Sequence, residues 1–288
     1  MRRGYFEDSF VHHFVAWHSE ADRIRSLPPV INRGYYARHM IIKSLVLRFL
    51  EEYTTAVQVV VLGCGFDTLY FQLGAAGLLG SRVKTYVDCD FPDVIQQKKD
   101  ILDLHIRKES MDGVYRMVGD DLREGDVVMK ELAAAGIDRN VPTLFLAECV
   151  LVYMETAYSN TLLRNIAFPE SMVIVYEQVN PHDAFGKQMM LNLRIRGCPL
   201  KGIIDSLEAH KERMSGCGWQ HASSEYMLTL FNTCIPRKEI ERINRIEMLD
   251  EEEEWNLLLR HYCITWARNS KKLLLPSMSD ITSVISST

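Results

Sequence analysis

Carboxylates and glycines directly follow several apolar, strand-like segments of this chain. Gly63 and Gly65 form the first such turn, where the missing Cβ permits positive φ and close approach of a ligand. Asp90 follows the second segment, where a carboxylate can accept hydrogen bonds from both ribose hydroxyls of an adenosine. A glycine turn and an aspartate N-cap before Pro92 are also common structural features, so neither motif decides the function alone.

Two later segments end in residues that suit the rest of such a ligand. Asp121 can accept from an adenine amino group while Leu122 packs on the ring, although an ordinary Asx turn also explains this pair. Glu148 places a charge in an apolar run, which requires a compensating interaction. Phe66 and its neighbours supply no third glycine of the dinucleotide fingerprint, so the pattern favours an adenosine without phosphates. The sequence therefore indicates S-adenosylmethionine as cofactor.

The elements that must position these residues alternate in type. Val57–Leu62 is a β-branched run with almost no polar alternation, which is typical of a parallel strand buried on both faces. The alternation predicts an α/β fold with a doubly wound, mostly parallel sheet, N-terminal helices and an inserted helical region. Strands are predicted over residues 57–62, 84–87, 114–118, 142–147, 172–176 and 257–267, and helices over 8–26, 35–52, 91–106, 156–166 and within 183–214.

No repeat, charge block or Ser/Gly linker interrupts the chain, which predicts a single domain over residues 1–288. Its expected parts are a helical lid (1–55), a cofactor-binding core (56–180), a helical insertion and substrate region (181–256), and a final strand and tail (257–288). The inserted helices, which carry Arg194 and Arg196, either cap the sheet or form a docking surface for a protein substrate.

Composition excludes several classes of function. A formal net charge of −5 provides no general positive field for nucleic acid or anionic membranes. The apolar runs are shorter than the ~20 residues that a bilayer crossing needs, and acidic residues follow the N-terminal arginines where a signal peptide would be apolar. Seven scattered cysteines without metal spacing fit a reducing compartment, and Cys64 is explained by its small side chain rather than as a nucleophile. We expect a cytoplasmic, metal-free monomer.

These motifs together resemble the eukaryotic leucine carboxyl methyltransferase family, which methyl-esterifies the C-terminal leucine of the protein phosphatase 2A catalytic subunit. The resemblance runs from about Gly4 to Ala267, and Glu148–Met154 and Tyr176–Asn180 are its most distinctive segments. The matching segments are residues 31–38, 62–68, 87–92, 121–123, 147–154, 176–180 and 261–263.

The resemblance implies a class I S-adenosylmethionine-dependent methyltransferase acting on that phosphatase tail. It places the cofactor contacts on Arg38, Gly63, Asp90, Asp121, Leu122 and Glu148. Spacing alone makes Arg38 one more basic residue on an amphipathic helix, but a guanidinium suits the carboxylate of the cofactor. Tyr153, Tyr176 and Gln178 are the candidates for the substrate-binding wall. No catalytic base is expected, because an α-carboxyl group with a pKa of about 3.3–3.7 is already ionised at neutral pH.

Two other interpretations remain open. Relatives with the same cofactor motifs methylate small-molecule acids or hydroxyls, and one branch acts on a hypermodified base of transfer RNA, which the net charge disfavours. The second alternative interpretation is a protein that binds the cofactor without turnover. Methyl transfer to the phosphatase subunit, but not to free small acids, would favour the leucine carboxyl methyltransferase interpretation over both alternatives.

Overall fold

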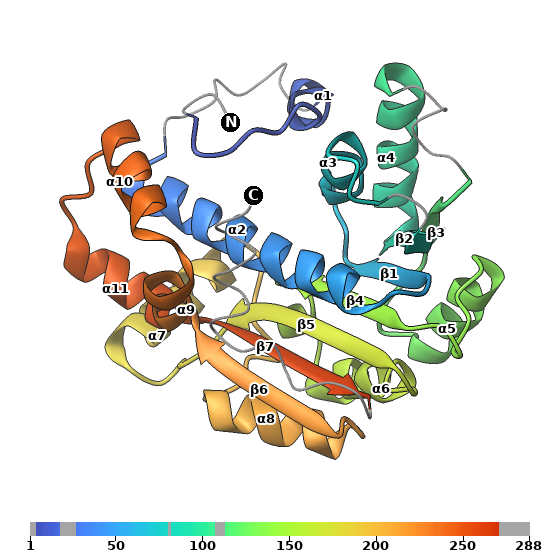
Figure 1. The fold of residues 1–288 in the computed structure, drawn as a ribbon. Helices are drawn as coiled ribbons and strands as arrows, with labels where there is room; N and C mark the ends of the chain where they lie inside the picture. Colours follow the sequence, from blue (N-terminus) through green and yellow to red (C-terminus); the bar gives the residue numbers. More distant parts are fainter. Residues whose placement is uncertain (1–3, 18–26, 80–81, 107–112, 271–288) are drawn as a thin grey trace.

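A seven-stranded sheet organises the residues described by the computed structural model, which are 4–17, 27–79, 82–106 and 113–270. The strand order is β3-β2-β1-β4-β5-β7-β6, with β1 to β5 parallel and β7 antiparallel to both of its neighbours (Figure 1). The strands are β1 Val57–Leu62, β2 Val83–Asp90, β3 Tyr115–Gly119, β4 Thr143–Glu148, β5 Ser171–Gln178, β6 His221–Tyr226 and β7 Tyr262–Asn269.

The core lies on both faces of this sheet. All six residues of β1 are buried, with Val59 and Val61 in one hydrophobic cluster and Val60 and Leu62 in the other. Helices α2, α3, α4, α9 and α11 contribute to the first cluster, and α5, α6 and α8 to the second. The helices are α1 Val11–Trp17, α2 Pro29–Glu52, α3 Leu69–Ala75, α4 Pro92–His105, α5 Gly125–Ala134, the 3₁₀ turn η3 Leu151–Tyr153, α6 Thr156–Asn165, α7 Ala184–Ile195, α8 Leu207–Gly216, α9 Met227–Cys234, α10 Arg237–Ile246 and α11 Glu252–Arg260.

The predicted fold class is confirmed, and the predicted strands lie within a few residues of the observed ones. The N-terminal helices differ from the prediction. Helix α1 spans Val11–Trp17, while residues 18–26 of the predicted helix lie outside the described residues. Helix α2 begins at Pro29 instead of residue 35, because proline is tolerated in the first helical turn, where its missing N–H has no intrahelical partner.

Two predictions for the C-terminal third were wrong. The insertion predicted as helical contains strand β6, whose sequence HASSEY has little apolar content because it is an edge strand paired with β7. Residues 257–260, predicted as strand, form the end of α11, since a short apolar run such as Leu257–Leu259 fits a helix or a strand equally well.

The order of the strands fixes where a ligand can bind. β1 has β2 on one side and β4 on the other, so the chain connections diverge between β1 and β4. In such open sheets, ligands bind beyond the carboxyl ends of the strands at this divergence. Gly63, Asp90, Glu148 and Gln178 all lie at these ends, as predicted from the sequence.

Candidate functional site

The turn after β1 is held tightly against its neighbours. The amides of Gly63 and Cys64 both donate to the carbonyl of Cys89 in β2, at 2.8 and 3.1 Å. Gly63 has φ of +65°, and a Cβ placed on it would lie 2.4 Å from a methyl group of Val150. The segment after β4 therefore packs directly on the turn after β1, and only glycine fits there.

Substituting alanine at Gly63 is expected to lower the free energy of unfolding by about 1–3 kcal/mol more than the same change at Gly65, because overpacking adds to the strain of positive φ. Gly65 is the matched control, since its φ is +46° but a Cβ added there would have no atom within 4 Å. Urea unfolding of Gly63→Ala and Gly65→Ala measures the difference. Equal losses would show that contact with Val150 is unimportant.

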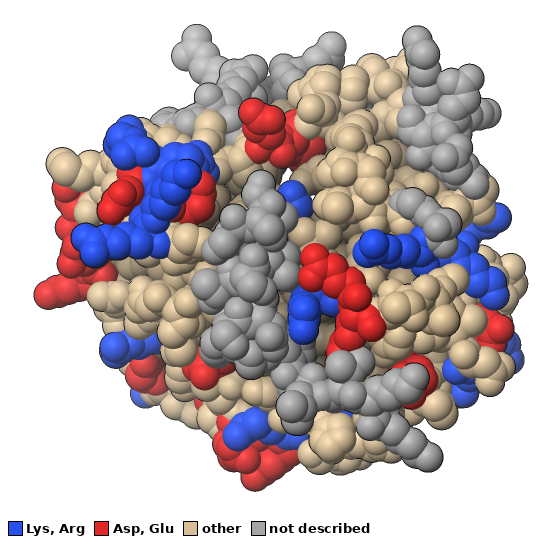
Figure 2. All heavy atoms as spheres, in the orientation of Figure 1, with Lys and Arg blue, Asp and Glu red and all other residues tan. Residues whose placement is uncertain are grey.

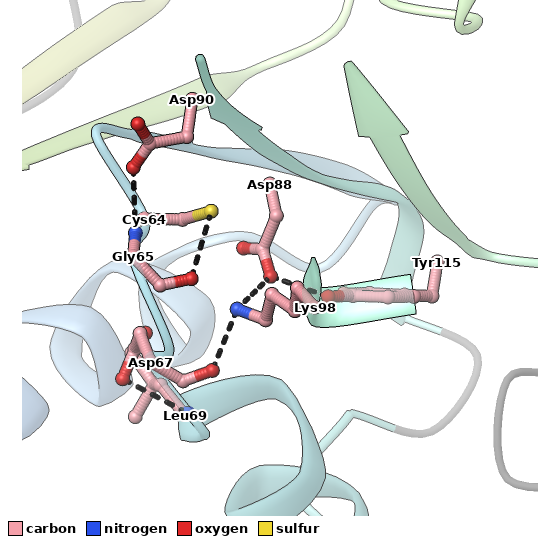
Figure 3. A network of polar contacts seen from close by, with 8 residues as sticks. All are labelled: Cys64, Gly65, Asp67, Leu69, Asp88, Asp90, Lys98 and Tyr115. Atoms are coloured by element: carbon pink, nitrogen blue, oxygen red, sulfur yellow. Dashed lines mark hydrogen bonds and ion pairs between the residues drawn. The ribbon is translucent and has the colours of Figure 1, made fainter. Parts of the chain in front are cut away.

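Asp90 closes the same turn from the end of β2. Its Oδ2 accepts from the Gly65 amide at 2.7 Å (Figure 3). Its Oδ1 accepts from the Phe91 amide at 2.7 Å. A carboxylate has about four lone-pair sites, so each oxygen retains capacity for a second donor. The structure thus places the predicted ribose-binding residue beside the glycine turn, and its contact with a cofactor stays a prediction.

Asp121 and Leu122 lie beyond the end of β3. The Asp121 carboxylate is ion-paired with exposed Arg123, whose hydrogen bonds lower the pKa of that carboxyl. Leu122 is buried in the cluster beneath α5 and is 7% exposed. Most of the Leu122 side chain is therefore used in packing, and only a small part of its surface is available to a ligand.

Arg38 and Glu148 meet across 110 residues of sequence. Arg38 Nε, on α2, lies 2.5 Å from Glu148 Oε2 at the end of β4. Burial by itself would lower the pKa of the Arg38 guanidinium, but the nearby Glu148 carboxylate keeps that pKa above its usual value. The two side chains remain 29% and 21% exposed, so this ion pair is reachable by a ligand. Arg38 thus supplies the compensating charge that Glu148 required.

The predicted substrate-binding residues adjoin this ion pair. The Arg38 guanidinium lies 4.9 Å from the centre of the Tyr176 ring, which stacks on Tyr262 at 5.2 Å. Gln178 Nε2 lies 3.4 Å from the Tyr262 hydroxyl. The cofactor candidates Arg38 and Glu148 therefore join the substrate candidates Tyr176 and Gln178 in one group near the ends of β4 and β5. Tyr262 was missed as a member because it comes from β7, far along the chain.

Glu177 anchors the 3₁₀ turn η3 that carries Tyr153. Its Oε1 accepts from the Val152 amide at 2.6 Å, and Arg213 Nη1 lies 3.9 Å from its Oε2. Tyr153 is 38% exposed at the end of this turn. Burial raises the pKa of Glu177 to about 7, although Arg213 and the η3 amides favour the charged form. Glu177 was part of the family motif but was not predicted as a site residue.

The raised pKa of Glu177 predicts a pH dependence of stability. Between the usual carboxyl pKa of 4.5 and about 7, the folded chain holds a proton that the unfolded chain has lost. The contribution of Glu177 to the unfolding free energy therefore falls as pH rises through this window. Glu177→Gln is expected to flatten that slope, measured by urea unfolding at pH 5.5, 6.5 and 7.5. The exposed Glu131→Gln is the control, and an unchanged slope in Glu177→Gln would contradict the prediction.

A buried ionic network lies beneath the glycine turn (Figure 3). Lys98 of α4, 0% exposed, donates to Asp88 Oδ2 at 2.6 Å and to the backbone carbonyl of Asp67 at 2.7 Å. The Tyr115 hydroxyl also donates to Asp88. Lys98 thereby joins α4 and β2 to the turn. Burial raises the pKa of the neighbouring Cys64 thiol, which supports a packing role for this cysteine.

Lys98 was missed by the sequence interpretation, although a signal was present. It shares a buried stripe of α4 with Ile95, Ile101 and Leu102, so a lysine stands at a helical core position. A lysine is almost never fully buried without a partner. Asp88, ten residues earlier at the end of the preceding strand, was the available carboxylate.

Charges of both signs are interspersed on the face shown in Figure 2, where basic side chains over α10 adjoin acidic ones. Among the described residues, no group of three His, Cys, Asp or Glu side chains is placed to hold a metal ion. No helix in the described ranges is both long and apolar enough to cross a membrane.

Comparisons with known proteins bear on the family and the fold of this chain. Residues 2–167 match the family model for leucine carboxyl methyltransferase. The chain is 36% identical to leucine carboxyl methyltransferase 1 of Caenorhabditis elegans, over 93% of this chain and 86% of that protein. It is 34% identical to human tRNA wybutosine-synthesizing protein 4, over 96% of this chain but 43% of that protein. A proposed methyltransferase from Thermobifida fusca shares the fold, with a TM-score of 0.53 at 13% identity, covering 81% of this chain and 82% of the other.

Proposed function

Since the chain belongs to the leucine carboxyl methyltransferase family, we propose that it methylates the α-carboxylate of the C-terminal leucine of the protein phosphatase 2A catalytic subunit. Membership makes it an S-adenosylmethionine-dependent methyltransferase. The proposal adds the acceptor and the residues that bind it. The product is a methyl ester on the phosphatase tail.

One observation carries the proposal, namely the partly exposed Arg38–Glu148 ion pair beside Tyr176 at the divergence of the sheet. The side chains there fit the cofactor by chemistry. Arg38 suits its carboxylate, because the ion pair with Glu148 uses Nε and the two terminal amino groups take no part in it. Glu148 suits an ammonium group, and Asp90 suits the ribose hydroxyls.

The remaining cofactor contacts follow from position. Gly63 permits close approach of the ligand, Asp121 would accept from the adenine amino group, and the exposed part of Leu122 would contact the ring. S-adenosylmethionine supplies an electrophilic methyl group when bound. Every other contribution comes from how the chain orients the acceptor and excludes water.

Tyr153, Tyr176 and Gln178 would hold the leucine tail. Gln178 Oε1 is buried and has no hydrogen-bond partner among the described residues. An acceptor in that state costs about 1–3 kcal/mol, which a peptide N–H from the tail would recover. The ring of Tyr153, which is 38% exposed, would pack on the leucine side chain, and Tyr176 would form the wall beside it.

The chain needs no general base for this reaction. The acceptor carboxylate is ionised at neutral pH, with a reference pKa of about 3.3–3.7. A hydrated carboxylate is a weak nucleophile, so alignment of its oxygen and removal of water are the main contributions that the protein can make.

Transfer of labelled methyl from S-adenosylmethionine to the phosphatase catalytic subunit tests the proposal, with the subunit lacking its final leucine as matched control. We expect label only on the intact tail, released by mild base as an ester. Label on both proteins would contradict the assignment to the terminal carboxylate.

Two parallel arms address the alternatives. In the first arm the acceptor is transfer RNA, because the chain is similar to tRNA wybutosine-synthesizing protein 4. In the second arm the acceptor is a set of small carboxylic acids. Calorimetric titration with S-adenosylmethionine completes the design. Cofactor binding without label in any arm would favour a protein that binds without turnover, and label on RNA alone would reassign the acceptor.

A further inference from the structure

Helix α7 and the segment after it form an open groove of about 600 Å³. The helix supplies one wall and residues 199–205 supply the other. Gly186 is the one fully buried residue of α7, so the helix packs little on the rest of the described chain. Its apolar side chains are correspondingly exposed, including Leu191 at 49% and Ile195 at 75%.

The side chains along the groove alternate in character. Lys187, Met190, Leu191 and Arg194 of α7 all line it, at the i, i+3, i+4 and i+7 spacing of one helical face. Two cations therefore flank an apolar centre. Lys201 adds a third cation from the opposite wall.

The acidic side chain of the groove is already paired. Asp205 is the one acidic residue among those that line it, and its Oδ1 lies 2.9 Å from His182 Nε2. With Lys187, Arg194 and Lys201 against this single carboxylate, the groove is locally basic on a chain whose formal net charge is −5.

The segment that forms the second wall of the groove is bonded to the elements that carry the proposed substrate residues. The Gly202 amide donates to the Val152 carbonyl at 2.9 Å, within the turn η3 that carries Tyr153. A Cβ on Gly202 would lie 2.2 Å from the Met154 carbonyl oxygen, so this wall packs closely against the residue after η3. Val179, directly after β5, pairs with Ile204 of the same wall.

We propose that this groove binds an acidic, apolar-containing peptide segment that precedes the methylated carboxylate of the protein substrate. The inference rests on the proposed function and adds a recognition site to it. Lys187 and Arg194 are seven helical residues apart, or about 10 Å along the axis. An extended peptide covers that distance in about three residues. The favoured segment therefore has two acidic residues about three positions apart with apolar residues between them.

Fluorescently labelled nonapeptides that end in a free leucine carboxylate test this site by anisotropy and by methyl transfer. Each carries two glutamates three positions apart, in three different registers, and has a twin with glutamines instead. The best glutamate peptide is expected to bind about tenfold more tightly than its twin, with an advantage that falls as salt rises. Binding by none of the peptides would overturn the proposal.

Charge-reversed variants locate the effect. Lys187→Glu/Arg194→Glu is expected to remove the preference for glutamate peptides. The control Lys84→Glu/Lys130→Glu changes the net charge equally at exposed positions outside the groove and is expected to keep that preference.

The apolar contacts are tested separately. Leu191→Ala is expected to weaken peptide binding several-fold, while Ile195→Ala, on the same helix but outside the groove lining, is expected to have no effect.

The outcomes separate this inference from the proposed function. Charge-dependent binding that is lost only in the groove variant, without methyl transfer to the peptides or to the phosphatase subunit, supports the groove and contradicts the proposed reaction. Equal transfer to glutamate and glutamine peptides supports the reaction and overturns the groove. Sedimentation showing that the groove variant alone abolishes self-association, with no peptide preference, would assign the groove to a second copy of this chain and overturn the proposal.

Discussion

Lys98→Met is expected to lower the free energy of unfolding by about 3–5 kcal/mol, because it leaves the buried Asp88 carboxylate without its cation. Methionine retains the apolar stem within the α4 stripe, so the loss reports on the charge rather than on a cavity. Urea unfolding at pH 7 measures it. Lys99→Met, next to it on the partly exposed side of α4, is the control and is expected to change little.

A second substitution tests the reason for that loss. Adding Asp88→Asn to Lys98→Met removes the uncompensated charge, so the double variant is expected to recover part of the stability. Cofactor affinity is expected to be weakened in both the single and the double variant, since Lys98 also holds the Asp67 carbonyl in the glycine turn. A loss below about 1 kcal/mol in Lys98→Met, or no recovery in the double variant, would show that the ionic network is not what stabilises this region.

Arg38→Ala is expected to weaken S-adenosylmethionine binding by about 1.5–3 kcal/mol, as for a lost hydrogen bond to a charged group, or roughly tenfold to a hundredfold in Kd. Removing the guanidinium also leaves Glu148 without its ion-pair partner. Calorimetric titration of the purified chain measures the change. Arg48→Ala, on the same helix and 3.9 Å from Glu51, is the control that removes an arginine from α2 away from the strand ends.

The partner of Arg38 provides the complementary measurement. If Arg38 contacts the cofactor carboxylate directly, Glu148→Gln retains a cation for it and weakens binding less than Arg38→Ala does. Equal losses in both variants, with no further loss in the double variant Arg38→Ala/Glu148→Gln, would mean that Arg38 acts only by holding Glu148. An unchanged affinity in Arg38→Ala would remove this arginine from the cofactor site.

Local sequence determined the parallel sheet and the place of the site. The β-branched run of β1 predicts a strand buried on both faces, because a strand of this kind is recognised from the types of its own consecutive side chains. The structure confirms this prediction. Gly63, Asp90 and Glu148 could be predicted as neighbours without knowing which side chains they contact, because the carboxyl ends of parallel strands meet at one edge of the sheet. Their contacts with the cofactor remain predictions.

Tertiary structure alone decided which distant groups pair. Arg38 meets Glu148 across 110 residues, Tyr176 stacks on Tyr262 from β7, and Lys98 is buried against Asp88. Hydrophobic periodicity predicts that a lysine or arginine on a helix lies at the surface, because burying an unpaired charge is costly. The periodicity reflects only the local sequence, so it cannot reveal a distant partner. Whether that cost is offset depends on a partner that the fold brings from elsewhere. For the same reason, the exposed face of α7 could be identified only from the folded chain.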